Sequence, residues 1–317
     1  MSTYVIRRTL LAIPVVLLVV GAVFLLMRML PGDAVDLMIT DSPYVRDSDR
    51  ADIRKDLGLD QSIPVQFGRW VGAATVGDFG TSIWTGKPVT KIISDRVEPT
   101  LQLVIMAMII GVSIGVPAGI VAAAYQRTWL DSVVRFLAVV GLTVPSFVLG
   151  TAVLVYLSKW SGWSPPLGYT SILDDPSKNL QQMLPPALVL GFSLSASSMR
   201  MMRSQMLEML RMDYVRTARA KGQKERVVVV RHAGRNAINP VLTIIGNQVA
   251  FLISGSLIME VLFGIPGLGR TLYDAITNRD YPLIQALVTM TAVGLVGINL
   301  LVDLSYGAFD PRLRFQR

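Results

Sequence analysis

Long apolar runs alternate with polar segments along the chain, and this pattern predicts membrane-spanning helices. A bilayer core requires about 20 mostly apolar residues in a helix. Six segments meet this requirement, and none shows the period-two alternation of a transmembrane β-strand. The expected fold is an all-α integral membrane protein with six transmembrane helices, at 9–30, 100–125, 134–158, 183–206, 238–262 and 284–305.

Proline and glycine occur inside several of these runs, as at Pro117, Pro145 and Gly255. They would be awkward in soluble helices, but membrane helices tolerate them because neighbouring helices satisfy the freed backbone groups. The run after Arg7-Arg8 could also be a secretory or twin-arginine signal. It is longer than an h-region of about 7–15 residues, and no small-residue cleavage pattern follows it, which favours a permanent first span.

Composition supports the membrane assignment and excludes several kinds of site. Of the 317 residues 52% are hydrophobic and 16% charged, whereas soluble domains carry roughly 25% charged residues. The absence of cysteine excludes thiolate catalysis, Cys-ligated zinc, iron–sulfur clusters and disulfides. The single histidine, His232, leaves little room for a histidine-based metal site. We therefore expect no catalytic residue, no metal site and no cofactor in this chain.

The positive charges predict the orientation. Residues 200–235 contain ten basic and three acidic residues, which accounts for seven of the eight net positive charges, and residues 31–99 contain eight basic and eleven acidic ones. Because Lys and Arg near the spans mark the cytoplasmic side, both termini, the loop 207–236 and the tail 306–317 are expected there. The loop 31–99 is then extracytoplasmic, with short helices expected at 49–57 and 65–74. It is too short for a sizeable core of its own, so it caps the bundle or docks a partner.

The cytoplasmic loop contains a short helix with clear end signals. Asp213 is a good N-cap and Gly222 a good C′ residue, which predicts a helix over 214–221, followed by a second helical run over 224–233. The small residues Ala218 and Ala220 would allow another protein surface to approach closely. From the residues alone, a positive-inside signal or an amphipathic helix on anionic lipid remains open, and nucleic acid is not an expected partner at a membrane surface.

The strings Asp213–Gly222 and Arg231–Pro240 resemble the EAA loop of binding-protein-dependent ABC importers, in its dipeptide/oligopeptide/nickel version. Ala218 and Gly222 match the motif, whereas Arg216-Thr217 replaces its Glu-Ala. Further resemblances, closest to the B-type subunits of dipeptide permeases, lie at Leu57–Asp60, Gly77–Ser82, Pro88-Val89, Val144–Phe147, Glu260–Gly269, Arg279–Pro282 and Asp310–Arg314.

The resemblance implies a type I ABC importer permease, a single domain over 1–317 in a prokaryotic inner membrane. Such a subunit pairs with a second homologous permease, two cytosolic ABC ATPase subunits or domains, and an extracytoplasmic binding protein that delivers peptide. ATP and Mg would be bound by the ATPases, because this chain has no G-x-x-x-x-G-K-[ST] loop. The ATPase-coupling residues implied are Asp213, Tyr214, Arg216, Ala218, Arg219, Lys221 and Gly222.

Polar residues within the spans are candidates for the translocation path, because lipid exposure of such groups is unfavourable. Hydrogen bonds between helices are an equally good explanation. The candidates are Thr143, Ser146, Asn247, Gln248, Ser254 and Ser256. Glu260 is expected to anchor the outer end of its span, and the glycines around Pro266 to form a turn closing the outer mouth.

Other functions remain as alternatives. The same architecture could import glutathione or a nickel chelate. An intramembrane serine protease would need a His or Lys base within the spans, which they lack. An ion-coupled secondary transporter would show intramembrane acids at mid-depth and an inverted repeat, and neither is evident.

Overall fold

The computed structural model describes residues 2–29, 60–166 and 168–309. These residues are mostly helical and include no strand, although an isolated antiparallel bridge joins Thr81 and Pro88. The expected all-α class is confirmed for this part of the chain, and the helix expected at 49–57 lies outside it. The chain divides into two compact units, unit 1 with residues 1–98 and 270–317 and unit 2 with residues 99–269.

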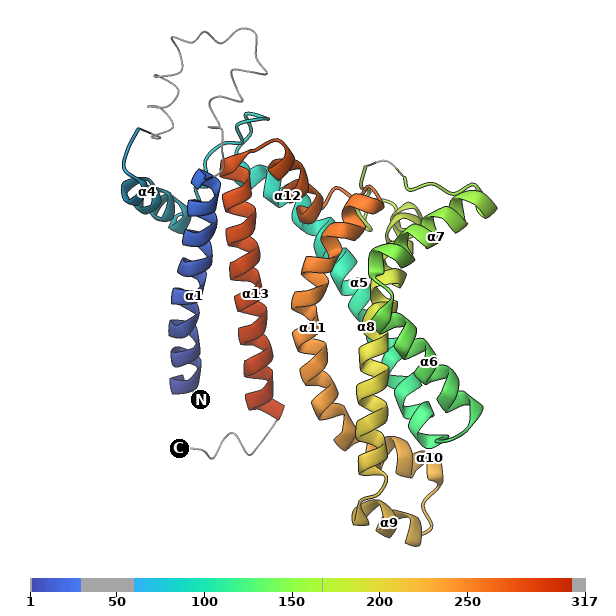
Figure 1. Cartoon of the computed structure of the whole chain (residues 1–317). Helices are drawn as coiled ribbons and strands as arrows, with labels where there is room; N and C mark the ends of the chain where they lie inside the picture. The colour runs from blue at the N-terminus through green and yellow to red at the C-terminus, as the bar shows by residue number, and fades with distance from the viewer. Residues whose placement is uncertain (1, 30–59, 167, 310–317) are drawn as a thin grey trace. The chain divides into compact units, whose positions relative to one another are not determined.

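In unit 1, α1 (Ser2–Met29) lies beside α13 (Tyr281–Phe309), as Figure 1 shows. α4 (Ile63–Thr75) confirms the helix expected at 65–74. It packs on α1 through aromatic rings, with the ring centroids of Phe24 and Phe67 5.2 Å apart. Arg28 strengthens this contact, because its guanidinium lies 3.5 Å from the Phe24 ring centroid and its Nε donates to Gln66 Oε1 at 2.8 Å.

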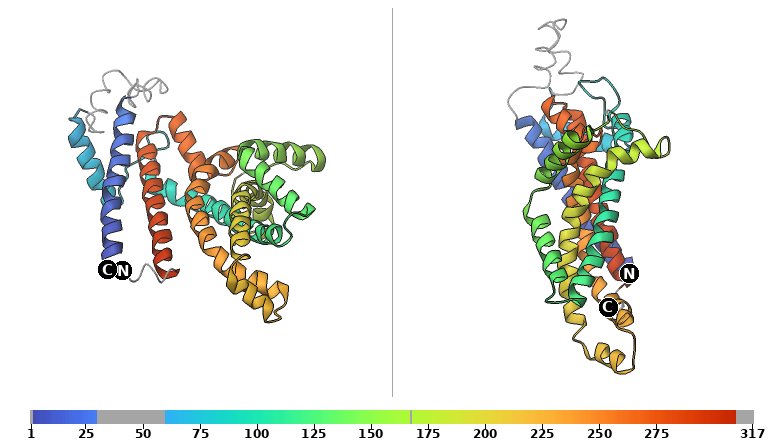
Figure 2. Two further views of the ribbon diagram at one scale, coloured as in Figure 1. Left: turned by 60° about the horizontal axis from the view of Figure 1, so that its bottom comes forward. Right: turned by 90° about the vertical axis from the view of Figure 1, so that its right-hand side faces the viewer.

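Unit 2 is organised around one long helix, α8 (Pro176–Met209), and helices that precede and follow it in the chain pack against it (Figure 2). Asp175 caps this helix by accepting the Lys178 amide at 3.0 Å, and Pro176 occupies its first turn. The other helices of unit 2 are α5 (Val89–Ala124, from Pro99 onward), α6 (Trp129–Thr143), α7 (Ser146–Ser161), α9 (Asp213–Ala220), α10 (Glu225–Val227), the π-helix η2 (Val228–Gly234) and α11 (Arg235–Leu262). α12 (Leu268–Thr277) begins at the end of unit 2.

α5 and α8 approach each other backbone to backbone. Gly111, Gly115 and Gly119 follow one another at four-residue spacing along α5 and face α8. A Cβ atom at Gly115 would lie 2.8 Å from the Ser195 carbonyl oxygen, and one at Gly119 2.8 Å from the Met199 carbonyl oxygen. This is the small-residue packing that brings membrane helices together in the absence of a hydrophobic driving force.

Two hydrophobic clusters fill the rest of unit 2. The first joins α5, α8, α11 and the turn after α11, and includes Leu103, Met183, Leu190 and Phe263. The second, here called the α9 cluster, lies at the opposite end of α8. It consists of Ala123, Met202, Met206, Val215, Ala218, Val228, Val229, Ala233, Ala237 and Val241.

The segment expected as one span at 134–158 is broken. α6 ends at Thr143, α7 begins at Ser146, and the two helices are bent by 103°. Pro145 is the physical reason, because the residue before a proline is forced away from helical geometry and the proline nitrogen has no hydrogen to donate. Val144 accordingly has φ −80° and ψ 122°, in the extended region.

The second inner helix is continuous with the helix that follows it. Residues 224–233 were expected to form a separate run, but α10, η2 and α11 join without leaving helical geometry, since Gly234 has φ −61° and ψ −39°. A bend of 52° occurs further on, between Glu225–Ile238 and Pro240–Ile253. The proline at position 240 accounts for it.

Two helical stretches, Val89–Ala124 and Tyr281–Leu300, are long and apolar enough to cross a membrane. Counting each of the two bent pairs as one span raises the number to four among the described residues, and Ile13–Met29 is a shorter apolar helix. Transmembrane segments are therefore supported, while the count of six spans stays a prediction.

Candidate docking helix and path residues

α9 is a short helix with a well-defined end. It has the expected eight residues but starts one residue earlier than predicted. The expected capping role of Asp213 is wrong: Asp213 is the first helical residue, and the N-cap is Met212, which has no capping side-chain bond. At the other end the Gly222 amide donates to the Arg219 carbonyl at 2.9 Å and the Gln223 amide to the Ala218 carbonyl at 3.3 Å. This is a Schellman motif, and Gly222 provides the required left-handed residue with φ 74°.

The two faces of α9 differ. Val215 and Ala218, three residues apart, are buried in the α9 cluster with 0% and 6% exposure. The expectation that Ala218 offers a close approach to another protein is therefore corrected, because this side chain faces the chain's own core. Ala220 is exposed, as are the remaining residues predicted to couple: Asp213, Tyr214, Arg216, Arg219, Lys221 and Gly222.

Polar contacts hold the loop around α9 to the start of the α10–η2–α11 helix. The Asn236 amide donates to the Tyr214 hydroxyl at 3.0 Å, and Arg219 binds both carboxylate oxygens of Glu225 at 3.1 and 2.7 Å. The hydrogen bond from Arg219 holds the pKa of Glu225 below its usual range. His232 lies 3.3 Å from the Gln223 amide oxygen. These contacts, with the buried Val215 and Ala218, make α9 a supported element rather than a free loop.

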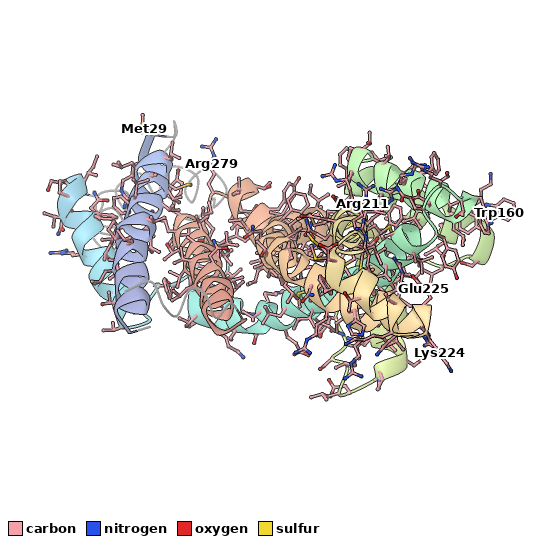
Figure 3. All side chains as sticks on the ribbon, turned by 90° about the horizontal axis from the view of Figure 1, so that it is seen from below. Met29, Trp160, Arg211, Lys224, Glu225 and Arg279 are labelled. Carbon is pink, nitrogen blue, oxygen red and sulfur yellow. The ribbon has the colours of Figure 1, made fainter. Side chains whose placement is uncertain are left out.

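The exposed surface of this end of unit 2 is basic. Figure 1 shows α9 beyond the ends of α8 and α10, and Figure 3, seen from below, labels Arg211, Lys224 and Glu225 in the same region. The exposed basic residues are Arg211, Arg216, Arg219, Lys221, Lys224, Arg226, Arg231 and Arg235. Most of the positive charge of the chain's most basic segment therefore surrounds α9.

The residues predicted to line a path fall into different environments. Thr143 is exposed and Ser146 half-buried, on either side of the break between α6 and α7. On α11, Asn247 is exposed, and Gln248 is half-buried with its amide donating to Ser197 Oγ of α8. Its carbonyl oxygen is buried and has no partner among the described protein groups.

Ser256 is buried, and its hydroxyl donates to the Ile253 carbonyl of its own helix at 2.8 Å. The side chain of Ser254 lies outside the described residues. Gln248 is therefore the α11 candidate whose polar group is directed at a neighbouring helix.

Glu260 lies near the far end of α11 and is buried beneath the turn that follows this helix. Its side chain is fully buried, and its Oε1 accepts the Thr100 hydroxyl at 2.7 Å, while Thr100 Oγ1 accepts the Leu268 amide at 2.8 Å. A Cβ atom at Gly267 would come within 2.5 Å of Thr100 Oγ1. The turn expected around Pro266 is present, and its glycine lets the backbone pass directly over this buried carboxylate.

The family described as binding-protein-dependent transport system inner membrane component matches residues 115–315. The N-terminal part of the same membrane component matches residues 1–104. The chain belongs to this family of transport components.

Curated relatives match over the full length. A probable peptide ABC transporter permease of Sinorhizobium fredii is 38% identical over 99% of this chain and 100% of its own length. A putative peptide transport system permease of Brucella abortus is 40% identical over 99% and 100%, and a glutathione transport system permease of Salmonella paratyphi A is 40% identical over 100% of both chains. The resemblance inferred from motifs is therefore confirmed.

A solved structure has the same fold. A chain from inward-facing conformations of the MetNI methionine ABC transporter aligns with a TM-score of 0.52 and 17% identity, over 69% of this chain and 96% of that one. Family membership makes this transport component a multi-pass inner membrane protein and the permease of its system, not the ATPase.

Two motifs that carry the family resemblance meet in unit 1 of this permease, a contact that the sequence did not reveal. Ser82, at the end of Gly77–Ser82, donates its hydroxyl to Asp280 Oδ2, and the Ile83 amide donates to Asp280 Oδ1 at 3.2 Å. Both side chains are buried, with 1% and 2% exposure. The pair joins segments about 200 residues apart and holds the start of α13.

Proposed function

We propose that this permease forms half of the translocation pathway of an ATP-driven ABC importer for di- and oligopeptides. The observation that carries the proposal is the full-length similarity of 38–40% to permeases named for peptide and glutathione transport. Because glutathione is itself a tripeptide, a short peptide is the substrate chemistry these relatives share. A second homologous permease, two cytosolic ABC ATPases that bind ATP and Mg, and an extracytoplasmic binding protein complete the assembly.

The α9 loop is the proposed coupling element, and the basic loop and both termini then face the cytoplasm. Support comes from its construction: a helix of eight residues with a Schellman end, one buried face and one exposed face. Such a helix can be displaced as a body. Because Val215 and Ala218 share a cluster with residues of α5, α8, η2 and α11, displacement of α9 by the ATPases would be transmitted to those helices.

The translocation path is proposed to include Gln248, Asn247, Thr143 and Ser146. Gln248 has the best support, since its buried carbonyl oxygen has no partner among the described groups, and a buried polar atom usually has one. A movement of α11 that exposed this oxygen would let water or a peptide supply the missing hydrogen bond. Ser254 stays a candidate from sequence, and Ser256 is the weakest because its hydroxyl is already satisfied.

Replacing Ala220 by tryptophan tests the docking role of α9. The side chain is exposed on the face away from the α9 cluster, so the substitution leaves the fold of the loop intact while obstructing a surface that docks there. We expect the ATPase subunits to co-purify poorly with Ala220→Trp and ATP-dependent peptide uptake in proteoliposomes to fall in step. Ala124→Trp, at an exposed alanine ending α5, is the matched control and should behave as wild type.

Equal co-purification and uptake for the two tryptophan variants would refute docking through α9. The transport assignment is tested in the unmodified complex, by requiring ATP, the binding protein and both permeases for uptake of dipeptides, longer peptides or glutathione. Uptake driven by an ion gradient without ATP would overturn the importer assignment itself.

A further inference from the structure

An ion pair between a buried carboxylate and a half-buried arginine joins α6 to α8 at the end of unit 2 that carries α9. Arg203 of α8 forms a bidentate contact with Asp131 of α6: Nε donates to Oδ1 at 2.6 Å and Nη2 donates to Oδ2 at 2.9 Å. Asp131 is 1% exposed. Two parallel charge-assisted bonds fix both the distance and the orientation of the partners, which a single hydrogen bond does not.

The same carboxylate also fixes the turn between α5 and α6. Its Oδ2 accepts the backbone amide of Arg127 at 3.1 Å, and Arg135 lies 3.5 Å away, one helical turn along α6. Arg127 has φ 66°, in the left-handed region, within the turn that reverses the chain. Asp131 thus holds the turn, the first turn of α6 and α8 together through one side chain.

The pair lies at the same level of α8 as the cluster that supports α9. Met202, next to Arg203 in sequence, and Met206, one turn further on, both belong to the α9 cluster. A Cβ atom at Gly119 would lie 2.6 Å from Met202 Cβ and 3.1 Å from the Arg203 amide nitrogen, so α5 is also in direct contact with α8 here. α6 packs along α8 but contributes no residue to the α9 cluster, and the ion pair is the charged contact that joins α6 to α8 at this level.

Stability alone is a poor explanation for such a pair. Desolvating the buried Asp131 carboxylate alone costs on the order of several kcal/mol, and replacing a buried ion pair by apolar residues of similar volume is often neutral or stabilising. What the pair provides in addition is a fixed geometry between two helices.

We propose that Asp131 and Arg203 are positioning residues that make α6 and the α5–α6 turn follow α8 when α9 is displaced. The inference rests on the proposed coupling function of α9. Through the pair, the movement that starts at α9 reaches α6 and hence the break at Pro145, where Thr143 and Ser146 lie. Breaking the pair should therefore lower the amount of peptide imported for each ATP hydrolysed.

The test compares uptake and ATP hydrolysis in the complete reconstituted complex. Asp131→Asn removes the negative charge of the carboxylate and keeps the shape of the side chain. Arg203→Lys keeps the positive charge but cannot form the bidentate hydrogen bonds. For both variants we expect the ratio of peptide imported to ATP hydrolysed to fall by at least about five-fold. A factor of this size corresponds to the lower end of typical coupling free energies between two sites. The double variant Asp131→Arg with Arg203→Asp should recover part of the ratio.

Asp95→Asn is the matched control, since it breaks the exposed ion pair Lys91–Asp95, whose side chains are 66% and 54% exposed. It should leave the ratio unchanged. A purely structural role for Asp131 would lower the yield of complex, uptake and hydrolysis together, with an unchanged ratio, and would overturn the proposal. If Asp131→Asn fails to assemble, a wild-type ratio for Arg203→Lys overturns it equally. Loss of coupling in Ala220→Trp but not in the pair variants would refute this inference while leaving the proposed function standing.

Discussion

Replacing Gly115 by alanine is expected to destabilise unit 2, because a methyl group has no room where α5 crosses α8. The new Cβ would lie 2.8 Å from the Ser195 carbonyl oxygen and 2.8 Å from Ser198 Cβ, below the 3.0 Å that real Cβ contacts respect. Two of the three nearest atoms belong to the backbone of Ser195, so no side-chain rotation relieves the clash. The helices must move apart.

The size of the effect follows from that movement. Separating packed surfaces by about 0.5–1 Å forfeits a quarter to a half of each contact's attraction. Because Gly111 and Gly119 lie along the same crossing, their contacts are loosened too. Overpacking of this kind costs about 1–3 kcal/mol, and we expect the upper half of that range. At roughly 2–4 °C per kcal/mol, the unfolding midpoint should fall by about 4–12 °C.

The assay is thermal unfolding of the purified permease in mild detergent, followed by size-exclusion chromatography after heating. Gly294→Ala in α13 is the matched control, since nothing lies within 4 Å of its new Cβ and alanine is the better helix former. Its midpoint should stay unchanged or rise. Equal midpoints for Gly115→Ala and Gly294→Ala would refute the close approach of the α5 and α8 backbones.

Two further predictions concern the loop that carries α9. Gly222→Ala should loosen the end of α9, because a φ of 74° disfavours a side chain even though the surrounding space is open. Limited proteolysis between α9 and α10 should then become faster. Gly222→Asn should be cleaved more slowly than Gly222→Ala, because asparagine tolerates this geometry. The Arg219–Glu225 pair should weaken on acidification. Because the pKa of Glu225 is lowered by folding, the contribution of the pair is present above the ordinary value of 4.5 and is lost as the pH falls through the lower folded value. Limited proteolysis between α9 and α10 should therefore become faster as the pH falls. Glu225→Gln, which has no titrating carboxylate, should remove this dependence on pH.

The sequence predicted the helical class and the α9 helix because both depend on local patterns. Apolar runs mark long helices wherever they lie, and a glycine after a short polar helix marks its end. Val215 and Ala218 also carried a local signal, since apolar residues three apart share one face of a helix. That spacing would have separated the buried Ala218 from the exposed Ala220, which was treated as its equivalent.

Features that depend on contacts between distant segments, or on the local backbone conformation, could not be predicted from such local patterns. Pro99, Pro117 and Pro240 lie inside helices, whereas Pro145 ends one, and the difference lies in the conformation of the preceding residue rather than in the residue type. The Ser82–Asp280 and Asp131–Arg203 contacts join residues 198 and 72 positions apart. No spacing rule relates such residues.

The α9 cluster and the Asp131–Arg203 pair are different kinds of contact at the same end of unit 2. The α9 cluster is apolar, and its contacts have no preferred direction, so under the proposed coupling role it would transmit a displacement of α9 to α8 and α11 without fixing the relative rotation of these helices. The Asp131–Arg203 pair is directional, since rotating α6 relative to α8 would break at least one of its two bonds. Under the proposed coupling role, a displacement of α9 would reach α6 through a contact that permits little rotation. This arrangement would allow a displacement at α9 to act at the break between α6 and α7 with little loss along the way.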